Sequence, residues 1–368
     1  MTDRVRELLA EFDPSLPLDR ARTIPASWYS SPEMAVAERR CIFGDSWLVV
    51  GRADQVVAPG SFLTADVAGW PILVVRDHDG FLRAFFNVCR HRAALLLTEP
   101  CGQASRIRCR YHGWTYELAG RLRGTPDFEG VAGFSRDDNG LQELAVQTWG
   151  PFVAVHLGKP EVDFAGYLAP LPADVEPGLR GLQFVERREY QLHCNWKLFV
   201  DNYLDGGYHV NTVHPELAGM LDYSHYRTEI FDWTSVQTSP LTTSIDSVRT
   251  GSAQYWYIFP NLMLNLYQGV MDTNLVLPLG SDRCRVIFDF YFAESGPASE
   301  PQFQVESVAV ADRVQMEDAA ICENVQRGLT SGVFNAGRFS VKREIAGYHF
   351  HRLLARRISS EAIDSENT

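Results

Sequence analysis

Two short motifs in the first half of the chain pair a cysteine with a histidine. One residue separates Cys89 from His91, two separate Cys109 from His112, and 17 residues lie between the pairs. Two thiolates and two imidazoles from two loops can hold a zinc ion or a [2Fe–2S] cluster of the Rieske type. Small zinc modules usually space their first pair by two to four residues, so the spacing favours the cluster, with zinc as the alternative.

The segment DNYLDGGYHVNTVH, residues 201–214, holds a second group of potential ligands. Asn202, Asp205 and His209 fall at offsets of three and seven. This spacing predicts that they share one face of a helix that begins near Trp196.

His214 lies five residues beyond His209, about 140° around an ideal helix, so the two imidazoles meet only if the helix loosens between them. Gly206 and Gly207 weaken the helix, because each glycine costs about 1 kcal/mol relative to alanine. Pro215 biases His214 away from helical backbone angles. We therefore expect the segment to turn two histidines toward one point; two surface histidines after a frayed helix are the alternative.

A long helix predicted over residues 301–328 supplies a third candidate ligand. Asp318 interrupts the apolar stripe of this helix, which consists of Ala311, Val314, Ile321, Val325 and Leu329. A buried, unpaired carboxylate is costly, so Asp318 should meet a metal or another cation; pairing with a buried arginine is the alternative. The neighbouring Glu317 has Arg313 at i−4, which predicts an ordinary solvated pair.

Two histidines and one carboxylate form the facial triad of non-haem Fe(II) oxygenases, which leaves coordination positions open for O₂. His209, His214 and Asp318 predict such a site. The cluster predicted in the same chain is consistent with this iron site, because O₂ cleavage needs electrons delivered one at a time and such a cluster carries single electrons. Asp205, one helical turn before the first ligand, is then an acid beside the iron site and not a ligand.

The elements around the first motif predict a small all-β domain. Short β-rich runs separated by turn residues begin at Trp47 and continue to about residue 158. The residues before them predict short helices over 5–12 and 32–43. We therefore divide the chain into N-terminal helices that pack on the catalytic domain (1–45), a cluster domain (46–158) and a catalytic domain (159–368).

The periodicity changes after a proline-rich connector. Apolar residues between Trp196 and Leu204 have helical spacing, and Asn195 is the predicted N-cap. Residues 225–295 return to strand patterns, and the long helix follows. These elements predict an α+β domain in which an antiparallel sheet packs against the long helix.

Composition limits the class of protein. The chain has 368 residues and a formal net charge of −12, which argues against nucleic acid as a partner and fits a soluble protein or a cationic substrate. It has neither a membrane-length apolar run nor the features of a signal or transit peptide, so we expect a cytoplasmic protein. The other cysteines are expected to be thiols without a metal: Cys41, Cys101, Cys194, Cys284 and Cys322.

Four segments together resemble the oxygenase (α) subunits of Rieske non-haem iron oxygenases, over nearly the whole chain. They are CRHR (89–92), CRYHGWTY (109–116), NWKLFVDNYLDGGYHVNTVH (195–214) and MEDAAICENVQ (316–326). The resemblance implies two sets of ligands. Those of the [2Fe–2S] cluster are Cys89, His91, Cys109 and His112, and those of the mononuclear iron are His209, His214 and Asp318.

The resemblance also implies a fold and partners. The catalytic domain would have the helix-grip (START-like) fold of the family. Asp205 would bridge a cluster histidine and an iron-ligating histidine across a subunit boundary in a head-to-tail homotrimer. Electrons would come from NAD(P)H through a separate flavin/iron–sulfur reductase or a ferredoxin.

Within the family, DNYLDGGYHV is most similar to the choline monooxygenases, which implies O₂-dependent hydroxylation or demethylation of a quaternary ammonium compound such as choline or a betaine. Aromatic residues in 225–295 could form a cation–π cage, or serve as ordinary strand core: Trp233, Tyr255, Trp256, Tyr257, Phe259 and Tyr267. The alternative functions are the α subunit of an aromatic-ring-hydroxylating dioxygenase, a Rieske electron carrier fused to a ligand-binding domain, and a zinc-stabilised binding module.

Overall fold

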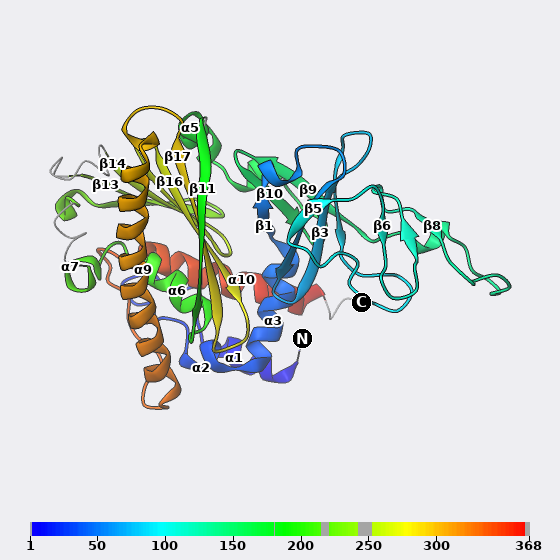
Figure 1. Ribbon diagram of the computed structural model, residues 1–368. Helices are drawn as coiled ribbons and strands as arrows, with labels where there is room; N and C mark the ends of the chain where they lie inside the picture. The colour runs from blue at the N-terminus through cyan, green and yellow to red at the C-terminus, as the bar shows by residue number, and fades with distance from the viewer. Residues whose placement is uncertain (1, 180, 215–220, 242–251, 365–368) are drawn as a thin grey trace. The chain divides into compact units, whose positions relative to one another are not determined.

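The structure is a computed structural model that describes residues 2–179, 181–214, 221–241 and 252–364. The chain divides into two compact units (Figure 1). One unit is the continuous segment Phe43–Tyr167, and the other combines Met1–Ile42 with Leu168–Thr368. The first unit therefore interrupts the sequence of the second.

The unit Phe43–Tyr167 is built mainly of β-strands, as predicted, and the strands pair antiparallel. Its larger sheet has the order β1-β10-β9-β4-β3-β2-β5. These strands are β1 (Trp47–Arg52), β2 (Ser61–Val67), β3 (Trp70–Arg76), β4 (Leu82–Phe86), β5 (Cys101–Gln103), β9 (Glu143–Trp149) and β10 (Phe152–His156). A smaller sheet consists of β6 (Ile107–Arg108), β7 (Thr115–Tyr116) and β8 (Leu122–Gly124). The short helix α4 (Phe164–Tyr167) ends the unit.

The core between these strands includes both motif cysteines. Alternating strand residues such as Leu73 and Val75 point into it, together with Trp114 from a loop. Cys89 and Cys109 belong to the same cluster of buried side chains. The thiols are thus held by the packed interior of the unit and not by its surface.

The other unit contains the second large sheet, whose strands are all antiparallel in the order β11-β17-β16-β15-β14-β13-β12. They are β11 (Leu182–Leu192), β12 (Arg227–Ile230), β13 (Thr234–Pro240), β14 (Ser252–Ile258), β15 (Leu262–Tyr267), β16 (Val270–Pro278) and β17 (Cys284–Ala293). The long helix α9 (Pro301–Thr330) runs beside this sheet (Figure 1). This arrangement confirms the predicted α+β architecture.

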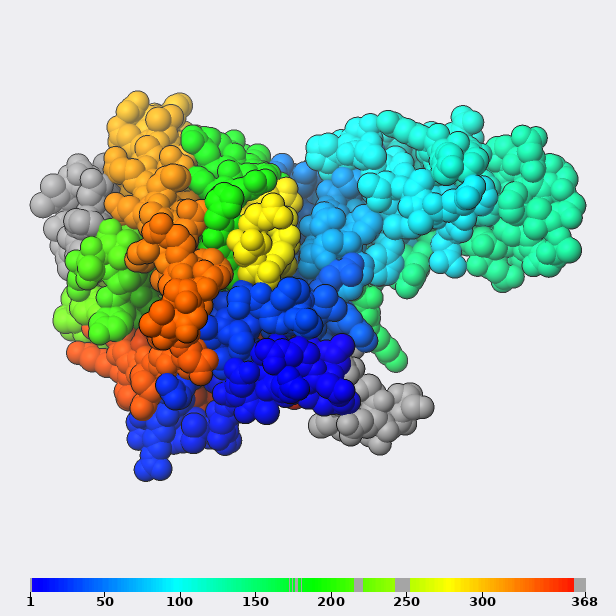
Figure 2. Space-filling view, turned by 90° about the horizontal axis from the view of Figure 1, so that it is seen from below, coloured from blue at the N-terminus to red at the C-terminus, as the bar shows by residue number. Residues whose placement is uncertain are grey.

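The other α-helices that the structure describes in this unit lie before the interrupting segment, after it in the middle of the chain, and at the C-terminal end. They are α1 (Asp3–Ala10), α2 (Ala26–Ser30), α3 (Pro32–Cys41), α5 (Leu171–Leu179), α6 (Trp196–Tyr203), α7 (Val210–Val213) and α10 (Ile345–Asp364). In the face shown in Figure 2, the N-terminal segment lies beside the orange segment that follows α9. Hydrogen bonds join the two segments: Gly337 N donates to Thr23 Oγ1 at 2.8 Å, and Arg338 Nε donates to Ala21 O at 3.0 Å.

A buried ion pair ties the N-terminal helices to α6. Lys197 Nζ donates to Glu38 Oε1 at 2.5 Å, and Trp196 Nε1 donates to the other oxygen of Glu38 at 2.9 Å. Burial lowers the pKa of Lys197 even though Glu38 opposes the shift. The predicted N-cap, Asn195, accepts from Lys197 N and donates to the carbonyl oxygen of Tyr29, so the start of α6 is fixed from two directions. None of the described helices is both long and apolar enough to span a membrane.

Candidate metal centres

The two Cys-His motifs form loops with equivalent hydrogen bonds. In each, the cysteine amide donates to the carbonyl oxygen five residues on, from Cys89 to Ala94 and from Cys109 to Trp114, both at 2.8 Å. The cysteine carbonyl accepts from the amide four residues on, at 3.0 and 3.1 Å. These paired turns direct both thiols inward, where each cysteine is 2% exposed.

The motif histidines lie next to each other. The ring centroids of His91 and His112 are 4.6 Å apart, and His91 stacks on Trp114 at 4.7 Å. Nδ1 of His91 is buried and has no hydrogen-bond partner in the described part of the chain. Burial raises the pKa of the Cys89 thiol. A buried ring nitrogen normally has a hydrogen-bond partner or a metal ion, and Nδ1 of His91 has no described hydrogen bond. Two cysteine sulfurs and two imidazoles are the ligands of a Rieske cluster.

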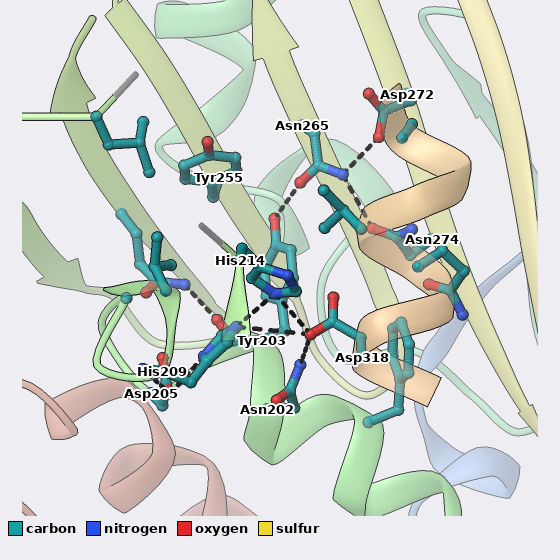
Figure 3. A pocket seen from close by; sticks show the side chains of 18 of the residues that line it. Asn202, Tyr203, Asp205, His209, His214, Tyr255, Asn265, Asp272, Asn274 and Asp318 are labelled. Atoms are coloured by element: carbon teal, nitrogen blue, oxygen red, sulfur yellow. Dashed lines mark hydrogen bonds and ion pairs between the residues drawn. The ribbon is translucent and has the colours of Figure 1, made fainter. Parts of the chain in front are cut away.

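A cavity of about 110 Å³ lies between the sheet of the other unit, α9 and the segment after α6 (Figure 3). His209 and His214 come from the segment after α6, and Asp318 comes from α9. The sheet contributes mainly aromatic and amide side chains: Gln237, Tyr255, Asn265, Tyr267, Asp272, Asn274 and Phe288. The cavity therefore joins a group of ligand-type residues to a wall that can contact a small organic molecule.

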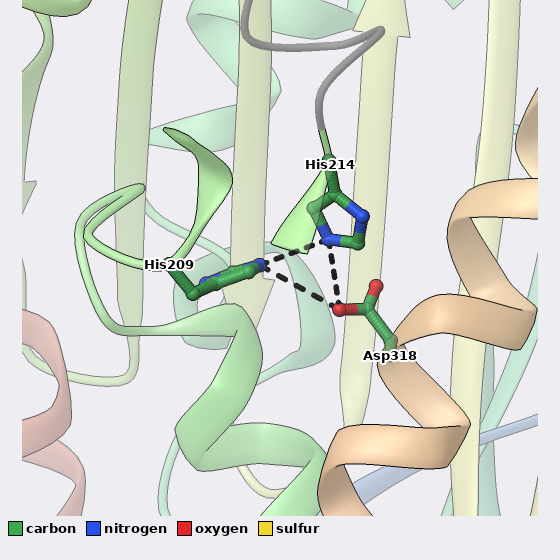
Figure 4. A group of neighbouring side chains, drawn as sticks. All are labelled: His209, His214 and Asp318. Atoms are coloured by element: carbon green, nitrogen blue, oxygen red, sulfur yellow. Dashed lines mark hydrogen bonds and ion pairs between the residues drawn. The ribbon is translucent and has the colours of Figure 1, made fainter. Parts of the chain in front are cut away.

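His209, His214 and Asp318 converge as predicted (Figure 4). Nε2 of His209 lies 3.1 Å from Nε2 of His214 and 3.5 Å from Oδ1 of Asp318, and the third edge of the triangle is 3.0 Å. Metal bonds of about 2.1 Å at right angles separate neighbouring donor atoms by about 3.0 Å. The triangle thus has the size of one face of a metal coordination sphere.

Hydrogen bonds to the outer ring nitrogens explain why these atoms converge. Nδ1 of His209 donates to Asp205 Oδ2 at 2.5 Å, and Nδ1 of His214 donates to Glu317 Oε2 at 2.6 Å. Each Nε2 then presents a lone pair toward Asp318. Burial lowers the pKa of His214, but hydrogen bonds to Asp318 and Glu317 outweigh it and the net shift is upward. Only a shared positive charge stabilises three acceptors at one point, so the residues fit a metal ion.

The helix before these ligands ends earlier than predicted. α6 stops at Tyr203, so Asp205 and His209 do not continue one helical face with Asn202. Gly206 and Gly207 adopt φ of +70° and +71°. A Cβ at Gly206 would lie 2.2 Å from the carbonyl oxygen of Arg343, so no other residue fits there. The predicted loosening at the glycine pair is correct, but the helix has already ended when the chain reaches these glycines.

Asp205 holds the turn that replaces the helix. Its Oδ1 accepts from the amide of Tyr208 and its Oδ2 from the amide of His209, both at 3.0 Å. With the imidazole of His209, the carboxylate accepts three hydrogen bonds. Its side chain is 15% exposed, and it lies beside the metal ligands without joining their triangle.

Glu317, for which we predicted an ordinary solvated pair with Arg313, is 42% exposed, but it also accepts from Nδ1 of His214, a role that we did not predict. Asn202, which we placed near the potential ligands without assigning it a contact, donates from Nδ2 to Asp318 Oδ1 at 2.6 Å. Glu317 and Asp318 are adjacent in sequence, and their carboxylates contact His214 at different nitrogens. The sequence carries no local signal for the contact of Glu317 with His214, because 103 positions separate the two residues.

We expect Glu317→Ala to weaken metal binding at His214 by about 10–100-fold, the usual cost of losing an outer partner of a ligating histidine. Glu317→Gln should retain most of the affinity, because its amide oxygen still accepts from Nδ1. Titration of the metal-free protein with Fe(II) measures both effects. Glu323→Ala, on the same helix, is a control because Glu323 accepts from the amide of His193 and contacts none of the ligands. Equal affinities for wild type and Glu317→Ala would contradict this role.

Comparisons with known proteins agree with both centres. Residues 46–135 match the Rieske [2Fe-2S] domain, and residues 179–360 match the ring hydroxylating alpha subunit (catalytic domain). The chain is 40% identical over 366 residues to the chloroplastic choline monooxygenase of Arabidopsis thaliana, covering 95% of this chain and 86% of that protein. It is 29% identical over 356 residues to the carnitine monooxygenase oxygenase subunit of Escherichia coli (strain K12), covering 91% and 93%.

Solved structures have the same architecture. The quaternary ammonium Rieske monooxygenase CntA in complex with L-carnitine superposes with a TM-score of 0.80 at 25% identity, covering 95% of this chain and 98% of that one. The naphthalene 1,2-dioxygenase of Rhodococcus sp. superposes with a TM-score of 0.80 at 20% identity, covering 98% and 99%. The second similarity concerns the fold alone.

Proposed function

Because this chain belongs to the Rieske non-haem iron oxygenases, we propose that it is an O₂-dependent monooxygenase that hydroxylates or demethylates a small quaternary ammonium compound such as choline or a betaine. The observation that carries the proposal is that His209, His214 and Asp318 line the same cavity as aromatic side chains of the sheet. Aromatic faces attract a trimethylammonium group, which offers no hydrogen-bond donor. The choline and carnitine monooxygenases among the relatives support this substrate class.

Members of the family use a Rieske [2Fe–2S] cluster and a mononuclear iron, and this chain has the domains for both. We assign the cluster to Cys89, His91, Cys109 and His112, and the iron to His209, His214 and Asp318. When bound, the cluster supplies single electrons and the iron activates O₂. The chain's own residues prepare the site: Asp205 and Glu317 fix the tautomers of the two histidines, and Asn202 orients Asp318.

We further propose that Asp205 joins the two centres of neighbouring subunits in a homotrimer. Its carboxylate holds His209 and lines a second cavity, which also includes Asp201, Glu344 and His351. His112 of a neighbouring subunit would approach Asp205 from that side, since this histidine is exposed in its own chain. Inter-subunit electron transfer in a quaternary ammonium Rieske monooxygenase supports the proposal. A separate NAD(P)H-linked reductase or ferredoxin would be the electron donor.

The substrate class is tested by turnover with choline, glycine betaine, benzoate and naphthalene, scored as O₂ uptake coupled to product. We expect coupled uptake with a quaternary amine and none with the aromatic compounds. The neutral analogue 3,3-dimethylbutanol should bind more weakly than choline, because each cation–π contact contributes about 0.5–2 kcal/mol. Coupled turnover of the aromatic compounds alone would instead identify a ring-hydroxylating dioxygenase.

A further inference from the structure

Five carboxamide side chains are among the described residues that line the cavity with the proposed iron ligands. They are Asn202, Gln237, Asn265, Asn274 and Gln315. The first four take part in hydrogen bonds with other residues of the protein. For Gln315, neither Nε2 nor Oε1 has a hydrogen-bond partner in the part of the chain that the structure describes. Gln315 therefore has a donor and an acceptor that the described protein does not use.

The burial of Gln315 makes these unused atoms significant. The residue is 1% exposed, so solvent does not take the place of a protein partner. A buried amide without a hydrogen bond is costly, and buried polar groups in native proteins nearly always have a partner. Glutamine has three side-chain torsions, so its amide can turn toward a molecule that fills the cavity. A bound ligand would thus supply the missing hydrogen bond.

The position of Gln315 on α9 places it beside the proposed iron site. Ala311, Val314, Gln315 and Asp318 all line the cavity, and their spacing of three and four residues marks one face of the helix. Residues three apart on a helix have Cβ atoms about 5–6 Å apart. The amide of Gln315 is therefore anchored one helical turn from the carboxylate of Asp318.

The chemistry of the amide indicates which part of a substrate it can bind. Oε1 accepts from an O–H group and Nε2 donates to an oxygen, so the side chain can bind a hydroxyl in either direction. A trimethylammonium group has neither a hydrogen-bond donor nor an acceptor to offer. A carboxylate can use Nε2 alone, and no lysine or arginine is among the lining residues that the structure describes to balance its charge. A hydroxyl is therefore the group that fits Gln315 best.

We infer that Gln315 binds the hydroxyl group of the organic substrate and determines specificity for quaternary ammonium alcohols. The inference rests on the proposed function and narrows its substrate class. The hydroxyl is held on α9 beside Asp318, and the aromatic side chains of the sheet are left to contact the ammonium group. The two ends of the substrate are thus recognised by different walls of the cavity.

The unmodified enzyme tests the inference with two cations that differ in one group. Choline and propyltrimethylammonium have nearly the same shape, but a methyl group replaces the hydroxyl in the second. Each is titrated by calorimetry into the iron-loaded enzyme in the absence of O₂. Choline should bind at least about ten-fold more tightly, because a site that hydrogen-bonds a hydroxyl discriminates against an analogue without it. Equal binding of the two cations, or tighter binding of propyltrimethylammonium, would overturn the inference.

Gln315→Met tests the residue, because it removes both hydrogen-bonding atoms at nearly constant side-chain length. We expect choline to bind about ten-fold more weakly and propyltrimethylammonium to stay within about two-fold of wild type, so that the preference for choline is lost. An equal loss of affinity for both cations would overturn the assignment, since a purely structural role predicts it. An unchanged preference for choline would overturn it as well.

Gln326→Met is the matched control. Gln326 is also a buried glutamine of α9, but its Oε1 accepts from the amide of Asn195 at 2.8 Å. It is not among the described residues that line the cavity. The control should therefore lower the melting temperature and keep the wild-type preference for choline.

Failure of the inference and failure of the proposed function give different results. If choline supports coupled O₂ uptake but binds no more tightly than propyltrimethylammonium, the inference fails and the proposed function stands. If no quaternary ammonium compound supports coupled uptake, both fail. The visible spectrum and melting temperature of Gln315→Met report whether it folds, and the titration of the wild type with the two cations decides the inference if it does not.

Discussion

Asp318→Ala should retain the visible absorption of the Rieske cluster while its mononuclear iron and its turnover are lost. Asp318 supplies the sole carboxylate of the triangle with His209 and His214, whereas the cysteines proposed for the cluster belong to the other compact unit. Loss of a metal ligand should exceed the 10–100-fold cost of losing an outer partner. Metal analysis should show a decrease from about three irons per chain to about two.

Glu306→Ala is the control for this experiment. Glu306 is an exposed carboxylate of the same helix that accepts from Gln302, so its removal should change neither iron content nor turnover. Loss of the cluster absorption in Asp318→Ala would contradict the assignment of the two sites to separate units. A colourless wild-type protein with stoichiometric zinc would contradict both sites.

The second large effect is expected for Asp205→Asn, which should keep both metals and turn over at least about 10–100-fold more slowly. The carboxylate accepts three hydrogen bonds, from two amides and from Nδ1 of His209. The amide of asparagine has one acceptor atom, so it must turn its NH₂ group toward one set of these donors. The negative charge that stabilises the histidine pair is also lost.

Stopped-flow reduction of the cluster should be normal in Asp205→Asn, and reoxidation in the presence of substrate and O₂ should be slow. Asp222→Asn is a close control, because Asp222 also accepts from two backbone amides, those of Ser224 and His225, and from Nδ1 of a histidine, His225. Asp222 is not among the residues that line the cavity. If Asp205→Asn reoxidised at the wild-type rate, the role in electron transfer would be contradicted, and Asp205 would only cap a turn.

The triangle of His209, His214 and Asp318 was predictable because residues close to them in the sequence restrict where these side chains can lie. A carboxylate within an apolar helix stripe must find a cation, which singled out Asp318. A glycine pair followed by proline must redirect the chain, which brought His214 back toward His209. Both arguments need only spacing and burial, so they hold without knowledge of the rest of the fold.

The features that were missed depend on which segments meet. Glu317 could be identified as a partner of His214 only after α9 was placed against the segment that follows α6. Asp272 lies seven residues from Asn265 and 35 from Gln237, and only the strand register unites them in one row. The close approach of Gly206, three residues after α6 ends at Tyr203, to the backbone of Arg343 also joins segments that are far apart in the chain. Local propensity carries none of this information.

The interruption of one unit by the other fixes an order of events during biosynthesis. The segment Phe43–Tyr167 is continuous, so the ribosome releases all of it before any of Leu168–Thr368. Glu38 and Tyr29 are synthesised before Lys197 and Asn195, the residues that they contact at α6. At a translation rate of about 5–20 residues per second, the interval between them is roughly 10–30 s. The nascent chain can therefore complete the unit that contains Cys89 and Cys109, and receive its iron and sulfur, while the N-terminal helices still lack α6, α9 and α10, which they contact in the folded protein.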